Sequence, residues 1–244
     1  LQLRDEVTGE IRDVLIFSPQ GLKPMGEKYL NIYQSGYIVG KFNPKTLKFK
    51  VETPFTELDA GFEFYAPQTI SGTGTSAAQD APHDETVMID GKLYQHPVPQ
   101  LDDAMPLQPI EPDEKGKLKE LKDARVFRLR GRVNVADERV KIKIKDTHGV
   151  ALSIVLDQDF VQMDRGGTRY TEGGSLRRRT LKRAKTRQFE LLVDGSAAEL
   201  FVGGKLAASL GAEIFSARTF FKGEKRRVRL TGGKVLSLEY ARKN

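Results

Sequence analysis

Apolar and polar residues alternate with a period of two along much of the second half of the chain. The strictest case runs from Val140 to Lys145, where valine and isoleucine alternate with lysine. This pattern gives one apolar face and one lysine face, as in a half-buried antiparallel strand. Val126 to Val133 alternates in the same way, and Val150 to Leu156 is more continuously apolar, which suits a central strand. The pattern predicts an all-β fold.

Further strand-like runs follow at intervals of about 8–12 residues, with turn residues between them, which is typical of a β-sandwich or a β-barrel. These predicted strands are Phe160 to Asp164, Phe189 to Asp194, Ala198 to Val202, Ser209 to Thr219, Val228 to Leu230 and Val235 to Tyr240. The glycine-rich stretch from Gly166 to Gly174 lacks a Gly-Lys-Ser/Thr sequence. We therefore interpret it as a turn and not as a phosphate loop.

The first 95 residues also predict short antiparallel strands, and no helix. The expected strands are Val14 to Phe17, Tyr29 to Gln34 with Gly36 to Gly40 as its partner, Phe42 and Phe49 on either side of an Asn-Pro turn, Phe62 to Thr69, and a hairpin from Thr86 to Tyr94. Asp90-Gly91 supplies the turn of that hairpin. Small and polar residues from Ser71 to Ala81 indicate a loop.

Five prolines fall between Pro97 and Pro112, and proline cannot serve in a central strand. We expect an extended linker there, with one short helical turn over Lys115 to Leu121. The expected organisation is therefore a first unit over residues 1–95, a linker over 96–123, and a β-sandwich over 124–244.

Composition excludes several kinds of chemistry. The 244 residues contain no cysteine and three histidines, so we expect no disulfide, no thiol catalysis, no metal site and no cofactor. His83, His96 and His148 lie in loop-like sequence and are expected at the surface. No apolar run is long enough to span a membrane, and the first residues lack a signal-peptide core, so we expect a cytoplasmic protein with no membrane partner.

The net charge is +7, and the basic residues form two clusters. The clusters are Arg177-Arg178-Arg179 with Lys182, Arg183, Lys185 and Arg187, and Lys222 with Lys225, Arg226, Arg227 and Arg229. We interpret both as solvated faces of strands and loops, with phosphate binding as the open alternative. Neither has the interleaved aromatic residues that stack on bases, so no nucleic-acid partner is expected.

Five segments resemble glycoside hydrolase family 32, and most of all its bacterial β-fructofuranosidases and sucrose-6-phosphate hydrolases. They are Asp13 to Gly21 (DVLIFSPQG), Asn31 to Tyr37 (NIYQSGY), Gly61 to Thr69 (GFEFYAPQT), Glu190 to Val202 (ELLVDGSAAELFV) and Phe215 to Phe220 (FSARTF). They occur in the same order as in the family and extend over most of the chain.

The resemblance implies a five-bladed β-propeller followed by a C-terminal β-sandwich, and hydrolysis of terminal β-fructofuranosyl bonds with retention. The family's catalytic carboxylates lie in WMNDPNG-like, RDP and EC motifs. None of these motifs is present, since the chain has no tryptophan, no cysteine and no Arg-Asp-Pro. We therefore expect only the last blades of the propeller here, with no catalytic residue in this chain and the catalytic carboxylates upstream of it. An apparent internal deletion joins Ile89 directly to Asp90.

The resemblance also places the segment from Asp59 to Gln68 at the sugar site. Asp59, Phe62, Tyr65 and Gln68 are then substrate-binding candidates, with Asp59 accepting hydrogen bonds from hydroxyls or holding the acid/base glutamate. The alternative is a turn aspartate and aromatic core residues. Glu57, Asp59 and Glu63 are the nearest paired carboxylates, and we do not expect catalysis from them.

The function implied is hydrolysis of sucrose, sucrose 6-phosphate or fructo-oligosaccharides, with a small sugar as the partner and homo-oligomerisation left open. One alternative is a non-catalytic β-sandwich that binds carbohydrate or serves as a scaffold. The other is a basic β-domain that binds nucleic acid.

Overall fold

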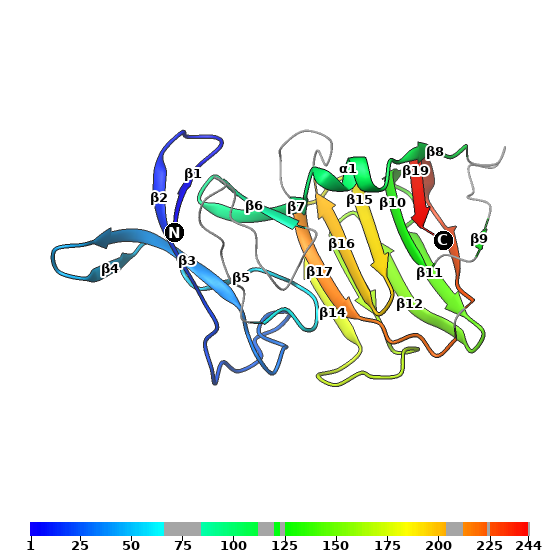
Figure 1. Cartoon of the computed structure of the whole chain (residues 1–244), viewed down its shortest axis with the longest axis horizontal. Coiled ribbons are helices and arrows are strands. Elements are labelled where there is room, and N and C mark those ends of the chain that lie inside the picture. Colours follow the sequence, from blue (N-terminus) through cyan, green and yellow to red (C-terminus); the bar gives the residue numbers. More distant parts are fainter. Residues whose placement is uncertain (66–83, 112–119, 123–124, 204–211, 224, 244) are drawn as a thin grey trace.

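The computed structural model describes residues 1–65, 84–111, 120–122, 125–203, 212–223 and 225–243, and these form three β-sheets (Figure 1). The predicted all-β class is confirmed. In this part of the chain the helix α1 (Gln100–Ala104) has five residues, and no helix is long and apolar enough to cross a membrane.

The largest sheet has eight strands in the order β6-β7-β17-β16-β15-β10-β19-β8. Its strands are β6 (Asp84–Ile89), β7 (Lys92–Pro97), β8 (Gln108–Pro109), β10 (Val126–Asn134), β15 (Thr186–Asp194), β16 (Ala197–Gly203), β17 (Ala212–Arg218) and β19 (Lys234–Lys243). The hairpin predicted around Asp90-Gly91 is confirmed, and both turn residues have positive φ angles, of 50° and 71°.

The second sheet has six strands in the order β14-β13-β12-β11-β18-β9. Its strands are β9 (Leu121–Lys122), β11 (Val140–Asp146), β12 (Gly149–Leu156), β13 (Phe160–Asp164), β14 (Leu176–Thr180) and β18 (Arg227–Thr231). The strict alternation of β11 appears as predicted, because Val140, Ile142 and Ile144 are fully buried whereas the lysines between them are not.

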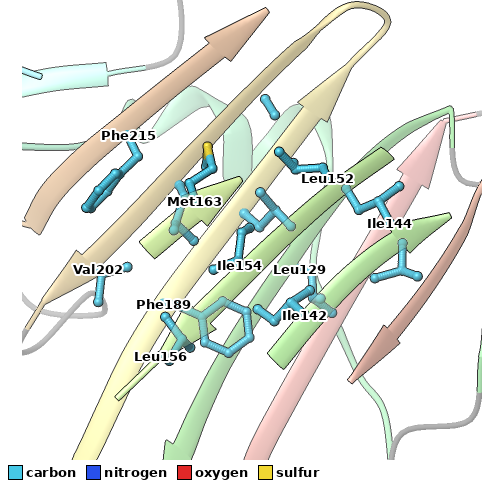
Figure 2. Packing of buried hydrophobic residues seen from close by; sticks show 14 of the residues in the cluster. Leu129, Ile142, Ile144, Leu152, Ile154, Leu156, Met163, Phe189, Val202 and Phe215 are labelled. Atoms are coloured by element: carbon cyan, nitrogen blue, oxygen red, sulfur yellow. The ribbon is translucent and has the colours of Figure 1, made fainter. Parts of the chain in front are cut away.

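One hydrophobic core lies between the eight-stranded and six-stranded sheets. Figure 2 shows Leu129 and Phe189 of the first sheet meeting Ile142, Ile154 and other side chains of the second. Each of these labelled side chains is fully removed from solvent, and burying one stabilises the fold by about 1.5–3 kcal/mol. Alternation therefore decides which face of each strand enters this core.

The third sheet has five strands and stands to one side of the other two (Figure 1). Its strands are β1 (Gln2–Arg4), β2 (Ile11–Phe17), β3 (Gly36–Asn43), β4 (Lys48–Val51) and β5 (Thr56–Glu57). Val14, Tyr37 and Val39 form a small second core with Met88 and Leu93 of the β6–β7 hairpin. The hairpin thus links the five-stranded sheet to the eight-stranded one.

Two predicted strands in this first part of the chain are wrong. Residues 29–34 form bends and irregular structure, and β3 pairs instead with β2, β4 and β5. Residues 62–65 are also irregular, while 66–69 lie outside the described residues. Phe62 packs against two arginines of the second half of the chain, whereas the rings of Tyr29 and Tyr33 contact Phe55 and Tyr65. An aromatic-rich run does not distinguish such packing from strand pairing.

The proline-rich segment is held along the eight-stranded sheet rather than fully extended. Helix α1 follows Pro99, and β8 pairs with β19 through Tyr240 and Gln108. Of the helical turn expected over Lys115 to Leu121, residues 115–119 lie outside the described residues and Leu121 belongs to strand β9. The predicted loop from Ser71 to Ala81 and His83 also lie outside them.

Candidate functional site

The loop of residues 59–65 docks on strand β17 through its backbone. The Ala60 amide donates to the Ile214 carbonyl and the Phe62 amide to the Ser216 carbonyl, both at 2.8 Å. Gly61 lies so close to this strand that a Cβ atom there would sit 2.1 Å from the Ser216 oxygen. Glycine is therefore required at position 61, because any side chain would push the loop off the sheet.

Asp59 fixes the start of this loop. Its carboxylate accepts hydrogen bonds from the amides of Ser216, at 3.0 Å, and Gly61. Burial raises the pKa of Asp59 to about 6, although the hydrogen bonds from Ser216 and Gly61 act in the opposite direction. With 4% of its surface exposed, Asp59 here has the contacts of a buried turn residue.

Phe62 is held between two arginines of the six-stranded sheet and the loop beside it. The guanidinium carbons of Arg165 and Arg177 lie 4.1 and 4.5 Å from the centre of its ring. Arg177 also donates to Asn31 Oδ1 at 2.7 Å and to the Gly61 carbonyl at 3.0 Å. The solvated face predicted for this basic cluster is therefore wrong at Arg177, which is buried because the loop covers it. It is also wrong at Arg187 of the same cluster and at Arg226 of the second cluster, which are buried as well.

The other two candidate carboxylates form ion pairs across the same contact. Glu57 accepts from Arg179, at 3.2 Å, and from the Tyr29 amide, at 2.9 Å. Glu63 pairs with buried Arg165 and accepts from the Arg218 amide at 2.9 Å. Neither carboxylate is free to attack a sugar, since each forms an ion pair that joins the segment of residues 57–63 to the second half of the chain.

A cavity of about 500 Å³ lies between this loop region and the outer face of strands β16 and β17. Phe62 and Tyr65 line it, as do Ile32 and Tyr33, and the rings of Tyr33 and Tyr65 are 4.9 Å apart. The structure thus brings two of the four predicted sugar contacts, Phe62 and Tyr65, into one cavity. Asp59 is buried beside it, and Gln68 lies outside the described residues.

Sequence reasoning missed Glu199, which also lines this cavity. Its residue is 7% exposed, and its Oε2 atom is buried without a hydrogen-bond partner. Burial, reinforced by the charges of Asp59 and Asp194, raises the pKa of Glu199 to about 7. Alternation along β16 places Glu199 on the face of the strand that points away from the core residues Ala198 and Leu200. Nothing in the sequence indicates that a distant loop covers this outer face.

The described histidines lie away from this cavity. His148 is exposed, as expected, whereas His96 is half-buried with its Nδ1 atom 3.1 Å from the Pro97 oxygen. Among residues whose placement is described, no three histidine, aspartate or glutamate side chains gather in a way that could hold a metal ion.

The N-terminal part of the chain is similar in sequence to known proteins. Residues 1–79 match the glycosyl hydrolases family 32 N-terminal domain. Sucrose-6-phosphate hydrolase of Bacillus subtilis (strain 168) is 57% identical over 58 residues, which are 24% of this chain and 12% of that protein. The resemblance to glycoside hydrolase family 32 is confirmed.

Similarity to family 32 also extends along the rest of the chain. Sucrose-6-phosphate hydrolase of Pediococcus pentosaceus is 27% identical over 252 residues, covering 90% of this chain and 48% of that protein. The solved structure of sucrose-6-phosphate hydrolase from Lactobacillus gasseri superimposes with a TM-score of 0.80 at 21% identity, covering 100% of this chain and 54% of that one.

A second solved structure gives the same result. A Bombyx mori GH32 beta-fructofuranosidase in complex with sucrose has a TM-score of 0.75 at 24% identity, covering 99% of this chain and 53% of that one. At these identities the two solved structures show a shared fold. The chain spans about half, or less, of the length of each of these relatives.

Proposed function

We propose that this chain is part of a family 32 glycoside hydrolase that cleaves terminal β-fructofuranosyl bonds with retention. The substrate class is sucrose, sucrose 6-phosphate or fructo-oligosaccharides. The observation that carries the proposal is the match of residues 1–79 to the family's N-terminal domain, together with 57% identity to a sucrose-6-phosphate hydrolase over 58 residues. The sheet arrangement supports it, since family 32 structures superimpose on nearly the whole chain.

In this proposal the five-stranded sheet belongs to the last blades of a β-propeller, and residues 124–244 form the C-terminal β-sandwich. Residues 96–123 connect them. Support comes from the single core shared by the eight-stranded and six-stranded sheets, and from the separate small core of the five-stranded sheet. The catalytic carboxylates come from outside these 244 residues.

The residues we propose for the sugar site are Phe62, Tyr65 and Gln68 as contacts and Asp59 as the residue that positions them. Tyr65 supports this best, because it lines the cavity and 38% of its surface is exposed. An aromatic ring at a cavity wall offers an apolar face to a sugar ring. Asp59 has no free oxygen directed to solvent, so its contribution is to hold the loop that carries Phe62 and Tyr65.

The chain by itself should not hydrolyse sucrose. Retaining hydrolysis needs two carboxyl groups about 5–5.5 Å apart, one free to attack and one free to protonate the leaving oxygen. Glu57, Asp59 and Glu63 are engaged by arginines or by backbone amides. These contacts also favour the second candidate, a non-catalytic module that binds carbohydrate at the cavity.

The test is glucose release from sucrose, measured for the isolated 27.3 kDa chain and for the same chain preceded by a family 32 segment that carries the three missing motifs. We expect turnover only in the longer protein, because only it contains the nucleophile and the acid/base group. Titration of the isolated chain with fructose measures whether the chain binds sugar without the upstream segment, as the non-catalytic module should. Turnover by the isolated chain contradicts the proposal, while saturable sugar binding with no turnover in a folded longer protein favours the module.

A further inference from the structure

Cations gather on the outer face of the six-stranded sheet. Ile142 and Ile144 of β11 and Val228 and Leu230 of β18 are buried in the core, and Leu121 of β9 packs against it. Because successive side chains of a strand point to opposite faces, the basic residues beside them point outward. These cations, which we call the basic patch, are Lys122 of β9, Lys143 and Lys145 of β11, and Arg227 and Arg229 of β18.

The strand register places like charges of the basic patch directly opposite one another. Lys143 is paired with Arg229, and Lys145 with Arg227. Arg227 is paired on its other side with Lys122. Like charges directly opposite one another destabilise a sheet. The basic patch therefore weakens this sheet, and a negatively charged partner would relieve the repulsion.

Few carboxylates neutralise the basic patch. Glu120 lies 3.8 Å from Arg227, and the other four cations form no ion pair with any residue whose placement is described. Asp146, at the end of β11, is buried and accepts three backbone amides, and Asp164 of β13 accepts another. Lys141 does not belong to the patch, because it lines a separate cavity with three acidic residues. The patch therefore keeps an excess of positive charge.

The two basic clusters of the sequence have different uses. Arg177, Arg178 and Arg179 of the first cluster each bind a side chain of the N-terminal part of the chain. The second cluster contributes Arg227 and Arg229 to the basic patch, where both are exposed. Phosphate binding, the open alternative to a solvated face, is therefore best supported for the second cluster, which the lysines of β11 and β9 enlarge.

The surroundings of the basic patch decide which kind of polyanion it fits. Its neighbours across the strands on β12 are Ser153 and Val150, so no aromatic ring is placed there for bases to stack on. A flat sheet face also does not enter a DNA groove, which admits a helix or a two-stranded ribbon. Phosphate contacts alone remain for a nucleic acid.

The spacing of the cations favours a chain of densely spaced anions. Patch residues on adjacent strands have backbones about 4.7–4.9 Å apart. An extended acidic peptide presents carboxylates on one side only about every 6.6–6.8 Å, which is wider. Successive groups of a polyphosphate share an oxygen and carry charge more densely. Their oxygens also accept charge-assisted hydrogen bonds from two cations at once.

We propose that the basic patch binds a linear chain of phosphate groups without bases, of the inorganic polyphosphate type. The chain lies across β9, β18 and β11, and its oxygens accept hydrogen bonds from the ammonium and guanidinium groups of the patch. This binding is independent of the proposed hydrolase function, because no residue of the patch lines the cavity at Phe62 and Tyr65.

The probe is end-labelled linear polyphosphate, titrated with the full 244-residue chain at neutral pH and followed by fluorescence anisotropy. We expect saturable binding at about 50 mM salt. The affinity should fall roughly a hundredfold by about 200 mM, because contacts to about five cations release several counterions. Orthophosphate at the same phosphate concentration should not compete, since a single ion contacts only part of the patch.

Lys143→Gln combined with Arg229→Gln removes one opposed pair of the patch. At about 50 mM salt this double variant should bind at least about tenfold more weakly, and the slope of log K against log salt should shrink by about 1–2. The matched control is Lys41→Gln with Lys50→Gln, which removes an opposed pair and the same charge from the five-stranded sheet. It should keep the salt slope of the unaltered chain.

Two outcomes with polyphosphate overturn the proposal. One is no saturable binding by the unaltered chain at about 50 mM salt, which does not depend on any variant. The other is an equal loss of binding in the two double variants, which would reduce the effect to net charge. Duplex DNA and polyglutamate of equal total charge are the rival ligands, and either one binding as tightly as polyphosphate also overturns it.

Discussion

Asp59 and Glu199 are two buried acids that differ in their hydrogen-bond partners. Asp59 accepts hydrogen bonds from the backbone amides of Gly61 and Ser216, which partly stabilise its negative charge. Glu199 has an oxygen with no partner. In both cases burial raises the pKa, to about 6 and about 7, so both retain protons that the unfolded chain releases.

This linkage predicts how stability changes with pH. A carboxyl whose pKa is raised on folding stabilises the folded state below its unfolded pKa, and this contribution is lost as pH rises through the folded value. For Glu199 the loss extends from about pH 4.5 to about 7. Glu199→Gln should therefore be more stable than the unaltered chain by roughly 1–3 kcal/mol at pH 8, and close to it at pH 4. Urea unfolding at both pH values measures this, and a constant difference between the two proteins would contradict it.

Asp59→Ala tests whether this aspartate acts through the loop or through the sugar. Removing the carboxylate leaves the buried Ser216 and Gly61 amides without an acceptor, which should cost about 1–3 kcal/mol of stability. Asp59→Asn keeps one acceptor oxygen and should lose less. In a full-length protein with the catalytic motifs, we expect a lower kcat/KM together with the lower melting temperature, since the loop carries Tyr65. Full stability with reduced kcat/KM would instead indicate direct contact with substrate.

At the scale of elements, a buried ionic network attaches helix α1 to strand β10. Arg128 is 1% exposed, and it binds Glu190, Asp102 and the Met105 carbonyl, the last two belonging to the helix and the residue after it. Arg128 therefore holds α1 on the sheet, in addition to the pairing of β8 with β19 further along the proline-rich segment. The period-two pattern placed Arg128 on the polar face of its strand but did not reveal the helix that covers it.

Substitutions in this network should be non-additive. Glu190→Leu leaves Arg128 and Arg130 without their buried partner and should cost about 3–5 kcal/mol. Combining it with Arg128→Met should recover much of the loss, because only Arg130 then keeps its charge there, and Arg130 is partly exposed and lies 3.6 Å from Asp102. Denaturant unfolding of both single variants and the double variant gives the coupling energy. A double variant as unstable as the sum of the two single variants would show that the network has no cooperative role.

At the scale of the whole molecule, the sheet arrangement predicts that residues 124–244 unfold cooperatively when expressed alone. The core between the eight-stranded and six-stranded sheets is built almost entirely from this segment. A longer piece, residues 98–244, should be more stable because it keeps the Asp102 and Met105 contacts of Arg128. Thermal unfolding followed by circular dichroism measures both. A shorter piece with no cooperative transition would place the unit boundary before residue 124.

The exposed apolar residues of the five-stranded sheet predict that the 244-residue chain self-associates. It exposes apolar side chains on β2, β3 and β4, among them Ile11 at 60%, Phe42 at 47% and Val51 at 55%. Exposed apolar strands favour pairing with another chain. Sedimentation should therefore show concentration-dependent association of the 244-residue chain and a monomer for residues 98–244. Association of the shorter piece to the same extent would move the interface to the two larger sheets.

Much of the second half of the fold follows from local sequence. Each strand predicted from Val126 onward is present, the one over Ser209 to Thr219 as β17 from Ala212, because alternation with a period of two fixes which face is buried and Asp, Gly and Ser mark the turns. Prediction failed at residues 29–34 and 62–65, whose aromatic residues pack against side chains distant in the sequence and do not belong to paired strands. The residues that carry the resemblance to family 32, including Gly61, Phe62 and Tyr65, were visible without the structure.

The sequence by itself determined the all-β class, the composition of the core strands, the family resemblance and the absence of the family's three catalytic motifs from these residues. These properties depend on residue identity and on spacing over a few positions. The tertiary structure alone decided that Arg177 is buried, that Asp59, Glu57 and Glu63 are occupied by ion pairs or amides, and that Glu199 faces a cavity without a partner. Burial of a polar side chain depends on which distant segment covers it, and the loop over Glu199 lies more than a hundred residues earlier in the chain.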